Sequence, residues 1–199
     1  MRIIGDVHGK VDRYQSIIAD CETSICVGDF GFKAEWDWYY KNIAPIGFDK
    51  PYRHLINMGN HDYLPYVGQY PSLGHYAELT IENKRIFTVR GADSIDKRLR
   101  LEGVDWFPDE ELSYSLAEDA LESYIEFAPE IVISHDCPQH VMEMLFGYTD
   151  KSLTRNLLQA MYDEWAPDLW IFGHHHQSID VEFDGCRFIC LNELEFIDF

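Results

Sequence analysis

The sequence predicts an α/β fold: a mixed central sheet, largely parallel inside, with helices on its faces. Five short apolar runs end abruptly in Gly, Asp, Asn, Ser or His, which is typical of buried strands. Segments with helical spacing alternate with these runs, and two further stretches have the pattern of β-hairpins. A length of 199 residues is sufficient for a substantial core, so we expect a single domain covering residues 1–199.

In the first half of the chain, apolar spacing and turn residues define the expected elements. Val11, Tyr14 and Ile18 recur at helical spacing, for example, shortly after the first strand. In chain order we expect a strand at 2–4, a helix at 10–20, a strand at 24–28, an aromatic-rich helix at about 34–43, a strand at 52–58, a loop at 63–74 and a hairpin at 75–90 that turns at Asn83-Lys84.

The second half begins with a segment at 91–112 that has no clean period and is expected to be irregular. Ser115 and Glu118 have the spacing of a capping box and predict a helix that ends at Pro129. Asp184-Gly185 is a strong turn signal for a final hairpin. The other expected elements are a strand at 130–134, a Met/Phe-rich stretch from Pro138 to Gly147, a helix from Asp150 to Pro167, a strand at 168–172 and hairpin strands at 178–183 and 186–192.

The formal charge of −19 is unusual for a chain whose composition is otherwise ordinary. Duplex nucleic acids and anionic membranes are bound through basic faces, so we expect neither as a partner. A phosphate-bearing substrate is compatible with this charge, because bound metal ions would reverse its sign locally.

Cysteine usage and the start of the sequence favour a cytoplasmic protein. The five cysteines are an odd number without Cys-x-x-Cys spacing, which argues for free thiols in a reducing compartment. Met1 and Arg2 lead directly into the first strand, so we expect no signal peptide. No apolar run reaches the length of about 20 residues that a membrane span requires.

The polar residues that follow five of the strands are the candidate functional residues. In an open α/β sheet, ligands bind beyond the carboxyl ends of the strands, so these side chains are expected to converge. They are Asp6, His8, Asp29, Asn60, His61, His135, His174 and His176.

Aspartate, asparagine and histidine suit divalent Mn, Fe, Zn, Ni or Co. Asp6 and His8 are two residues apart, so in an extended segment both side chains lie on one side. The same spacing joins His174 to His176. Such a set offers too many ligands for one ion that keeps a water, whereas two ions sharing a carboxylate would use them all. Asp29, alone in its motif, is the natural bridge.

The complete set of motifs resembles that of the calcineurin-like metallophosphoesterases. The motifs are, in family order, Asp6-x-His8, Gly28-Asp29, Gly59-Asn60-His61-Asp62, Ser134-His135 and Gly173-His174-x-His176. The resemblance spans residues 5–176, and the five motifs together are far more specific than any one of them. It implies a four-layer α/β/β/α sandwich, with mixed central sheets, that holds two metal ions at one end.

The resemblance also implies a role for each residue. The first metal would be held by Asp6, His8, Asp29 and His176, and the second by Asp29, Asn60, His135 and His174. His61 would contact the phosphate and protonate the leaving oxygen. Two ions about 3.5–4 Å apart would clamp the phosphoryl oxygens and lower the pKa of a bridging water to about 7, which makes it a nucleophile. Manganese is the metal that we expect first, with Fe, Zn, Ni or Co as alternatives.

The second motif departs from the family's protein phosphatases, which continue it as Gly-Asp-x-x-Asp-Arg-Gly. Here Phe32 replaces the carboxylate that would orient His61, and Lys33 replaces the phosphate-binding arginine. Lysine cannot reproduce the bidentate hydrogen bonding of arginine. Asp62 is a candidate for orienting His61, and we count it with His61 among the catalytic residues.

Six of the sixteen basic residues lie between Lys84 and Arg100. Arg90 and Arg98 in this segment are candidate substrate contacts, together with Lys33, Asn60 and His61. The alternative, which we favour for the segment as a whole, is a solvated hairpin and loop that offset neighbouring acids.

We therefore expect a dinuclear metal-dependent hydrolase of phosphate esters, a mono- or diesterase that acts on a small or nucleotide-like substrate. A protein Ser/Thr/Tyr phosphatase and a single-strand nuclease of the same fold are alternatives, disfavoured by Phe32 and Lys33 and by the net charge respectively. A metal-containing scaffold that binds protein partners is a non-enzymatic alternative, and the presence of His61 argues against it. The sequence leaves the oligomeric state open.

Overall fold

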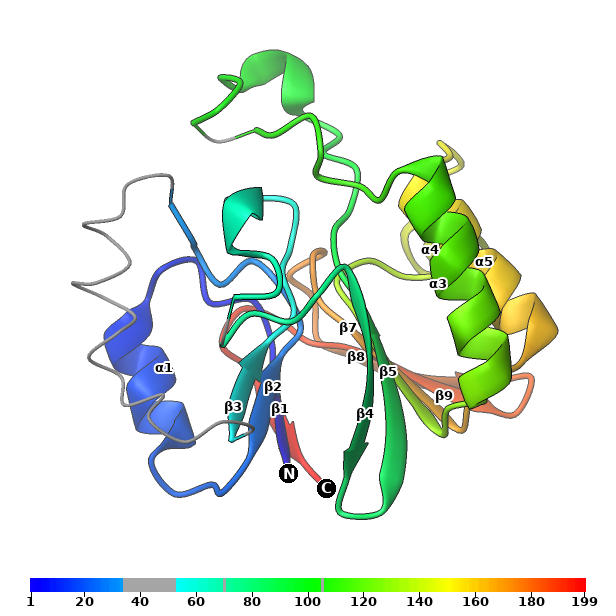
Figure 1. Cartoon of the computed structure of the whole chain (residues 1–199), viewed down its shortest axis with the longest axis horizontal. Coiled ribbons are helices and arrows are strands. Elements are labelled where there is room, and N and C mark those ends of the chain that lie inside the picture. The colour runs from blue at the N-terminus through cyan, green and yellow to red at the C-terminus, as the bar shows by residue number, and fades with distance from the viewer. Residues whose placement is uncertain (34–52, 70, 105) are drawn as a thin grey trace.

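The computed structural model describes residues 1–33, 53–69, 71–104 and 106–199, and Figure 1 shows their arrangement. The helix expected at 34–43 and the first residue of the strand expected at 52–58 lie outside these residues. None of the described helices is both long enough and apolar enough to span a bilayer.

The first sheet has four strands in the order β10-β1-β2-β3. Three of them, β1 (Arg2–Ile4), β2 (Ser24–Cys26) and β3 (His54–Ile56), run parallel. Strand β10 (Phe196–Asp198) pairs antiparallel with β1, and the sequence pattern did not predict it.

The second sheet has six strands in the order β4-β5-β6-β7-β9-β8. Its central strands are parallel, and each edge is one arm of an antiparallel hairpin. The strands are β4 (Tyr76–Ile81), β5 (Lys84–Val89), β6 (Ile131–Ser134), β7 (Leu169–Phe172), β8 (Ile179–Phe183) and β9 (Cys186–Cys190). The final hairpin turns at Asp184-Gly185, as predicted, whereas the first turns at Glu82-Asn83, one residue earlier than expected.

Helices cover the outer face of each sheet, which gives the four layers α/β/β/α (Figure 1). Helix α1 (Val11–Ile18) packs on the first sheet. Helices α3 (Tyr114–Phe127), α4 (Gln139–Phe146) and α5 (Leu153–Glu164) pack on the second. The residue pattern alone indicated one central sheet, and the two sheets implied by the family resemblance are confirmed.

Alternating strand residues fill the three apolar layers between these elements. On β2, Ile25 belongs to the core between the sheets, whereas Cys26 belongs to the core beneath α1. On β7, Ile171 belongs to the core between the sheets and Trp170 to the core beneath α3 and α5. Strands buried on both faces read as continuous apolar runs, which is the pattern that the sequence displayed.

Two helix starts differ from the sequence-based expectation. Helix α3 begins after Ser113, whose hydroxyl accepts a hydrogen bond from the Leu116 amide at 3.4 Å, so the capping residue is not Ser115. Helix α5 is capped by Ser152 and not by Asp150. In both cases a second residue of a type favoured at N-caps lies two positions away, so the sequence alone offered two starts.

Asn57, directly after β3, joins the two sheets at the end where the polar loops leave them. Its side-chain amide donates to the carbonyl of Val27, directly after β2 of the first sheet, at 3.0 Å, and to that of Val89 at the end of β5 in the second sheet at 2.9 Å. The side chain is completely buried. It therefore fixes the separation of the sheets at this edge.

Replacing Asn57 with leucine should lower the free energy of unfolding by about 2 kcal/mol, because a similar volume is kept but two buried hydrogen bonds are lost. Urea unfolding followed by circular dichroism measures the difference. Asn156→Leu on the exposed face of α5 is the matched control and should change stability by less than about 0.5 kcal/mol. Equal stability of the two variants would show that the bridge between the sheets contributes nothing.

Candidate metal centre

The loops that follow β1, β2, β3, β6 and β7 meet at one edge of the two sheets. In Figure 1 both chain termini lie at the opposite end of the strands. All seven predicted metal ligands lie on these loops. Contacts among their side chains join every one of the five loops, so the convergence expected from the strand ends is present.

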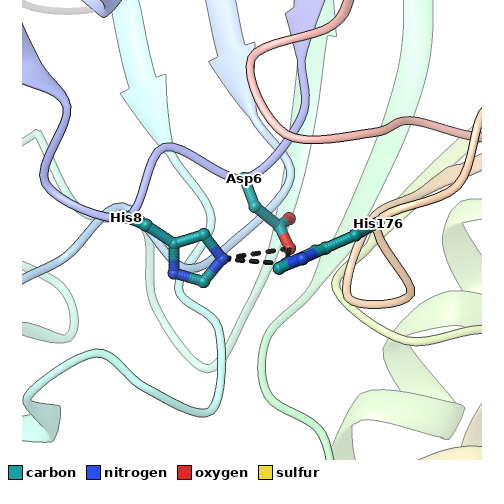
Figure 2. A group of neighbouring side chains, drawn as sticks. All are labelled: Asp6, His8 and His176. Atoms are coloured by element: carbon teal, nitrogen blue, oxygen red, sulfur yellow. Dashed lines mark hydrogen bonds and ion pairs between the residues drawn. The ribbon is translucent and has the colours of Figure 1, made fainter.

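The first group of ligand atoms consists of Asp6, His8 and His176 (Figure 2). The Nε2 atom of His176 lies 3.2 Å from Asp6 Oδ2 and 2.9 Å from His8 Nε2. His8 Nε2 is 3.9 Å from the same carboxylate oxygen. Two imidazole nitrogens and a carboxylate oxygen thus face a common point at the surface of the molecule.

The second group is buried and lies around His135. Its Nε2 atom is 2.9 Å from Asn60 Oδ1 and 3.5 Å from Asp29 Oδ1. The ring of His174 packs against the His135 ring with centroids 5.0 Å apart. The other oxygen of Asp29, Oδ2, lies 4.0 Å from His8 Nε2 in the first group. The Asp29 carboxylate therefore lies between the groups, with one oxygen towards each.

The charge states follow from burial and from the neighbouring groups. Burial would raise the pKa of Asp29, but the positive charge and hydrogen bonding of His135 outweigh it and hold that pKa below its usual range. Burial opposes protonation of His135 too, yet Asp29 and Asp6 raise its pKa to about 9. Burial lowers the pKa of His174 to about 3, so its imidazole is neutral at physiological pH.

This donor set fits divalent metal ions. Asp6 is completely buried, and its Oδ1 atom has no hydrogen-bond partner among the described residues, which is costly for an ionised carboxylate. A neutral His174 offers a nitrogen lone pair, as metal ligation requires. Carboxylate, amide oxygen and imidazole are the ligands that Mn, Fe, Zn, Ni and Co accept. Two groups of such atoms, Asp6 with His8 and His176, and Asp6 with Asp29 and His135, lie close enough together to hold a metal ion.

Four of the predicted ligands have a left-handed backbone conformation. The φ angles are 48° at His8, 43° at Asp29, 64° at His174 and 49° at His176. Residues other than glycine occupy this region at a cost of about 1 kcal/mol or more, so they occur there mainly where the surrounding structure enforces it. At these four residues the left-handed conformation bends the backbone directly after the strand, next to the metal centre.

Glycines in two motifs make room for the carboxylates. A Cβ atom on Gly59 would lie 2.0 Å from Asp29 Oδ1, and one on Gly173 would lie 2.2 Å from Asp6 Oδ1. Any larger residue would displace a carboxylate. Steric space therefore explains why these two motifs begin with glycine.

Asp62 does not orient His61, in contrast to the expectation from sequence. Its buried carboxylate accepts four backbone hydrogen bonds, from Phe30 at 3.0 Å, Gly31 at 2.7 Å, Phe32 at 2.8 Å and Gly59 at 3.0 Å. These bonds hold the loop after β2 in place. These are the contacts of a structural residue of the second motif's loop, and they give no support to the assignment of Asp62 as catalytic.

His61 lies at the boundary between the centre and solvent. Its backbone amide donates to Asp29 Oδ1 at 2.9 Å, and its Nε2 atom lies 3.3 Å from Asn60 Nδ2. The Nδ1 atom is buried and has no hydrogen-bond partner among the described residues. The backbone amide therefore ties His61 to Asp29, and the amide of Asn60 contacts one nitrogen of its ring.

A pocket of about 570 Å³ opens directly over both groups. Besides the ligands, its wall includes Lys33, His61, Ile95, Arg100, Phe146 and Tyr148. Lys33 has no ion-pair partner among the described residues, whereas Arg100 is paired with Asp96 at 2.6 Å. Ile95 was not predicted, and Arg100 was considered only as a member of the basic segment 84–100, because both lie where the sequence shows no regular pattern.

Neither Arg90 nor Arg98 is among the described residues that line this pocket, so the pocket gives no support to the expectation that they contact substrate. The Arg90 guanidinium is 2% exposed and donates to the carbonyls of Asp109 at 3.1 Å and Glu110 at 3.2 Å. It fastens the end of the segment 91–112 to β5. Arg98 is exposed on the short 3₁₀ helix η3 (Lys97–Leu99).

Sequence reasoning did not identify Ser94, Glu110 and Asp136, which lie beside the predicted ligands. Asn60 Nδ2 donates to Ser94 Oγ at 2.8 Å, and Ser94 in turn bonds to Glu110. His175 lies 3.1 Å from the buried Asp136 and stacks on Phe146 with ring centroids 4.1 Å apart. An asparagine ligand needs an acceptor for its NH₂ group, which is the only signal that could have prompted the search.

Comparison with known proteins identifies the family. The model of the calcineurin-like phosphoesterases matches residues 2–178, which is most of the chain. The chain belongs to this family. It is thus a metallophosphoesterase by family, of the class of phosphoric ester hydrolases, whose members depend on metal ions and act on phosphate esters. A search of curated proteins found no match.

Solved structures share the fold at low sequence identity. The protein TT1561 of Thermus thermophilus has a TM-score of 0.59 and 14% identity, with 96% of this chain and 89% of that chain covered. The phosphopantetheinyl hydrolase PptH of Mycobacterium tuberculosis gives 0.58 and 13%, with coverage of 96% and 89%. A candidate 5′-nucleotidase of Staphylococcus aureus gives 0.58 and 16%, and this chain covers 48% of its length, about half, with 96% of this chain aligned.

Asp62→Asn should lower the free energy of unfolding by about 2–3 kcal/mol, because an amide offers one acceptor oxygen and turns its NH₂ towards backbone donors. Urea unfolding of the metal-free protein measures this without interference from the metal centre. Asp119→Asn on the exposed face of α3 serves as control. If Asp62→Asn were as stable as the control, the four backbone hydrogen bonds would not be what holds the loop.

Proposed function

We propose that the chain is a dinuclear metal-dependent hydrolase of phosphate esters with a small or nucleotide-like substrate. The observation that carries the proposal is the position of Asp29. One of its carboxylate oxygens lies 3.5 Å from His135 Nε2 and the other 4.0 Å from His8 Nε2, so a single side chain lies between the two proposed sets of ligands. A carboxylate shared between two ions would use both of its oxygens in this way.

The first ion would be held by the group around Asp6 and the second by the group around His135, with Asp29 shared. Two divalent ions at these positions supply Lewis acidity and an activated water for attack on phosphorus. Manganese is our first choice, and iron, zinc, nickel and cobalt suit the same donors.

His61 and Lys33 are the residues that we assign to the substrate. Both line the pocket over the ligand groups, and His61 is tied to Asp29 through its backbone amide. His61 would donate a proton to the leaving oxygen, and the ammonium group of Lys33 would bind a phosphoryl oxygen.

The dimensions of the pocket favour a small substrate. About 570 Å³ lies within the range of sites for small ligands, roughly 300–1,000 Å³. Ile95, Phe146 and Tyr148 supply apolar and aromatic surface for the alcohol part of the ester. A protein phosphatase or a single-strand nuclease would need an extended surface beyond this pocket, and both remain as alternatives.

We propose a reducing compartment for the protein from the state of its cysteines. All five cysteines are free, and four of them are buried, which agrees with a reducing compartment such as the cytoplasm. We also propose that the chain is one domain, since both sheets share the core that contains Ile3 and Ile133.

The manganese-loaded protein should hydrolyse small phosphomonoesters or phosphodiesters, including nucleotides, faster than phosphopeptides or single-stranded oligonucleotides. All substrates are compared at equal concentration, with bound manganese measured in parallel. Asp29→Asn is the control variant and should weaken both metal sites together. Full occupancy by two ions without hydrolysis of any ester would refute the enzymatic function, and tight binding of two ions by Asp29→Asn would refute the shared carboxylate.

His61→Ala should keep both metal ions and lose a factor on the order of 10²–10⁴ in kcat on esters with a poor leaving group, where protonation of the leaving oxygen matters. With p-nitrophenyl phosphate the loss should be smaller, because p-nitrophenolate leaves without a proton. Metal content and kcat for both kinds of ester decide the matter. Equal losses on the two would rule out proton donation by His61.

A further inference from the structure

The amide of Asn60 is the first member of a buried chain of hydrogen bonds. Asn60 Nδ2 donates to Ser94 Oγ at 2.8 Å, and the Ser94 hydroxyl donates to Glu110 Oε2 at 2.5 Å. The backbone amide of Ser94 donates to the other oxygen of Glu110 at 2.9 Å. All three side chains are buried, with 1%, 2% and 5% exposure, so solvent does not replace these partners.

Glu110 sets the direction in which these hydrogen bonds are donated. An ionised carboxylate can only accept hydrogen bonds, so it takes the one proton of the Ser94 hydroxyl. Ser94 Oγ is then an acceptor towards Asn60, and only the NH₂ group of the amide can face it. The carbonyl oxygen of Asn60 is thereby turned to the opposite side, where it lies 2.9 Å from His135 Nε2 within the metal centre.

Glu110 is itself held firmly. The buried guanidinium of Arg90 donates to the carbonyls of Asp109 and Glu110, at 3.1 and 3.2 Å, at the base of the segment. The stretch between Ser94 and Glu110 carries three residues of the pocket wall, Ile95, Asp96 and Arg100. Figure 1 shows this stretch rising above the strand ends. The wall of the pocket and the Asn60 ligand therefore share one anchor.

We propose that Glu110 and Ser94 are positioning residues that determine which atom of the Asn60 amide faces the metal centre. The inference rests on the proposed function, because it gives Asn60 the role of a ligand. It goes further by assigning the choice between oxygen and nitrogen to a carboxylate that touches neither metal nor substrate. Glutamate at position 110 presents the oxygen, and a neutral amide there would present the nitrogen.

Glu110→Gln tests this choice with almost no change of shape. The Ser94 backbone amide still needs an acceptor, so the glutamine oxygen faces it and the glutamine NH₂ faces Ser94 Oγ. The hydroxyl then donates towards Asn60, whose amide turns its oxygen to Ser94 and its NH₂ to the metal centre. We expect binding of the second manganese equivalent to weaken about 10–100-fold while the first is unchanged, measured by titration calorimetry and by metal analysis.

The double variant Asn60→Asp/Glu110→Gln separates this effect from a loosened loop. A carboxylate at position 60 accepts the reversed Ser94 hydroxyl through one oxygen and keeps the other for the metal. We therefore expect the double variant to recover the second site. Asn60→Asp alone places two carboxylates on a hydroxyl with a single proton and should unfold at a lower temperature than the double variant.

Matched controls complete the experiment. Glu102→Gln makes the same substitution at an exposed position of the same segment and should bind two ions as the unchanged protein does. If Glu110→Gln also binds two ions with unchanged affinity while Asn60→Ala loses one, the positioning role is overturned but Asn60 stays a ligand. If the double variant binds the second manganese ion as weakly as Glu110→Gln does, the positioning role is overturned as well. If even Asn60→Ala keeps both ions, the ligand assignment and the proposal built on it are both wrong.

Discussion

Two buried carboxylates, Asp6 and Asp29, are the constraint on which the rest of the centre depends. Neither is more than 2% exposed, and an ion removed from water costs several kcal/mol unless other groups replace its solvation. The replacement comes from other strand ends: the backbone amide of His174 bonds to Asp6 at 3.0 Å, that of His61 bonds to Asp29 at 2.9 Å, and the His135 ring lies within 3.8 Å of both. Closing these contacts requires the two sheets to meet at this edge, where Asn57 joins them.

The five loops are consequently interlocked. The backbone amide of His61 in the third loop donates a hydrogen bond to Asp29 in the second loop. In the opposite direction, the backbone amides of residues 30–32 in the second loop donate to Asp62 in the third. The left-handed φ angles at His8, Asp29 and His176 are tolerated because each loop is fixed by a neighbour and not by its own sequence. A change in one loop is therefore expected to move a ligand in another.

The sequence was informative about the polar residues that follow each strand. It was much less informative about the residues that contact them from other parts of the chain. Apolar runs and their polar ends predicted the strands and the meeting of the loops, and they pointed to the seven residues that we propose as ligands, since those features are local. It did not separate one sheet from two, because burial on both faces reads alike in either arrangement. Arg90 was misread because a charged residue at a strand end resembles a substrate contact, whereas tertiary structure pairs it with carbonyls some twenty residues further on. Glu110 and Ser94 stood in a segment without any period, and only the fold brings them to Asn60.

The net charge of −19 raises the question of how an anionic ester approaches such a protein. The Debye length at physiological ionic strength is about 8 Å, so exposed carboxylates further away than this are largely screened. What an incoming phosphate meets is set by the pocket itself, where Lys33 has no ion-pair partner within the described part of the chain and the charge of Arg100 is balanced by Asp96. The uncompensated positive charge there would then come from Lys33 and from the ions held by the buried carboxylates. An acidic chain can thus bind an anion because attraction within a few ångströms outweighs the screened repulsion of the remaining surface.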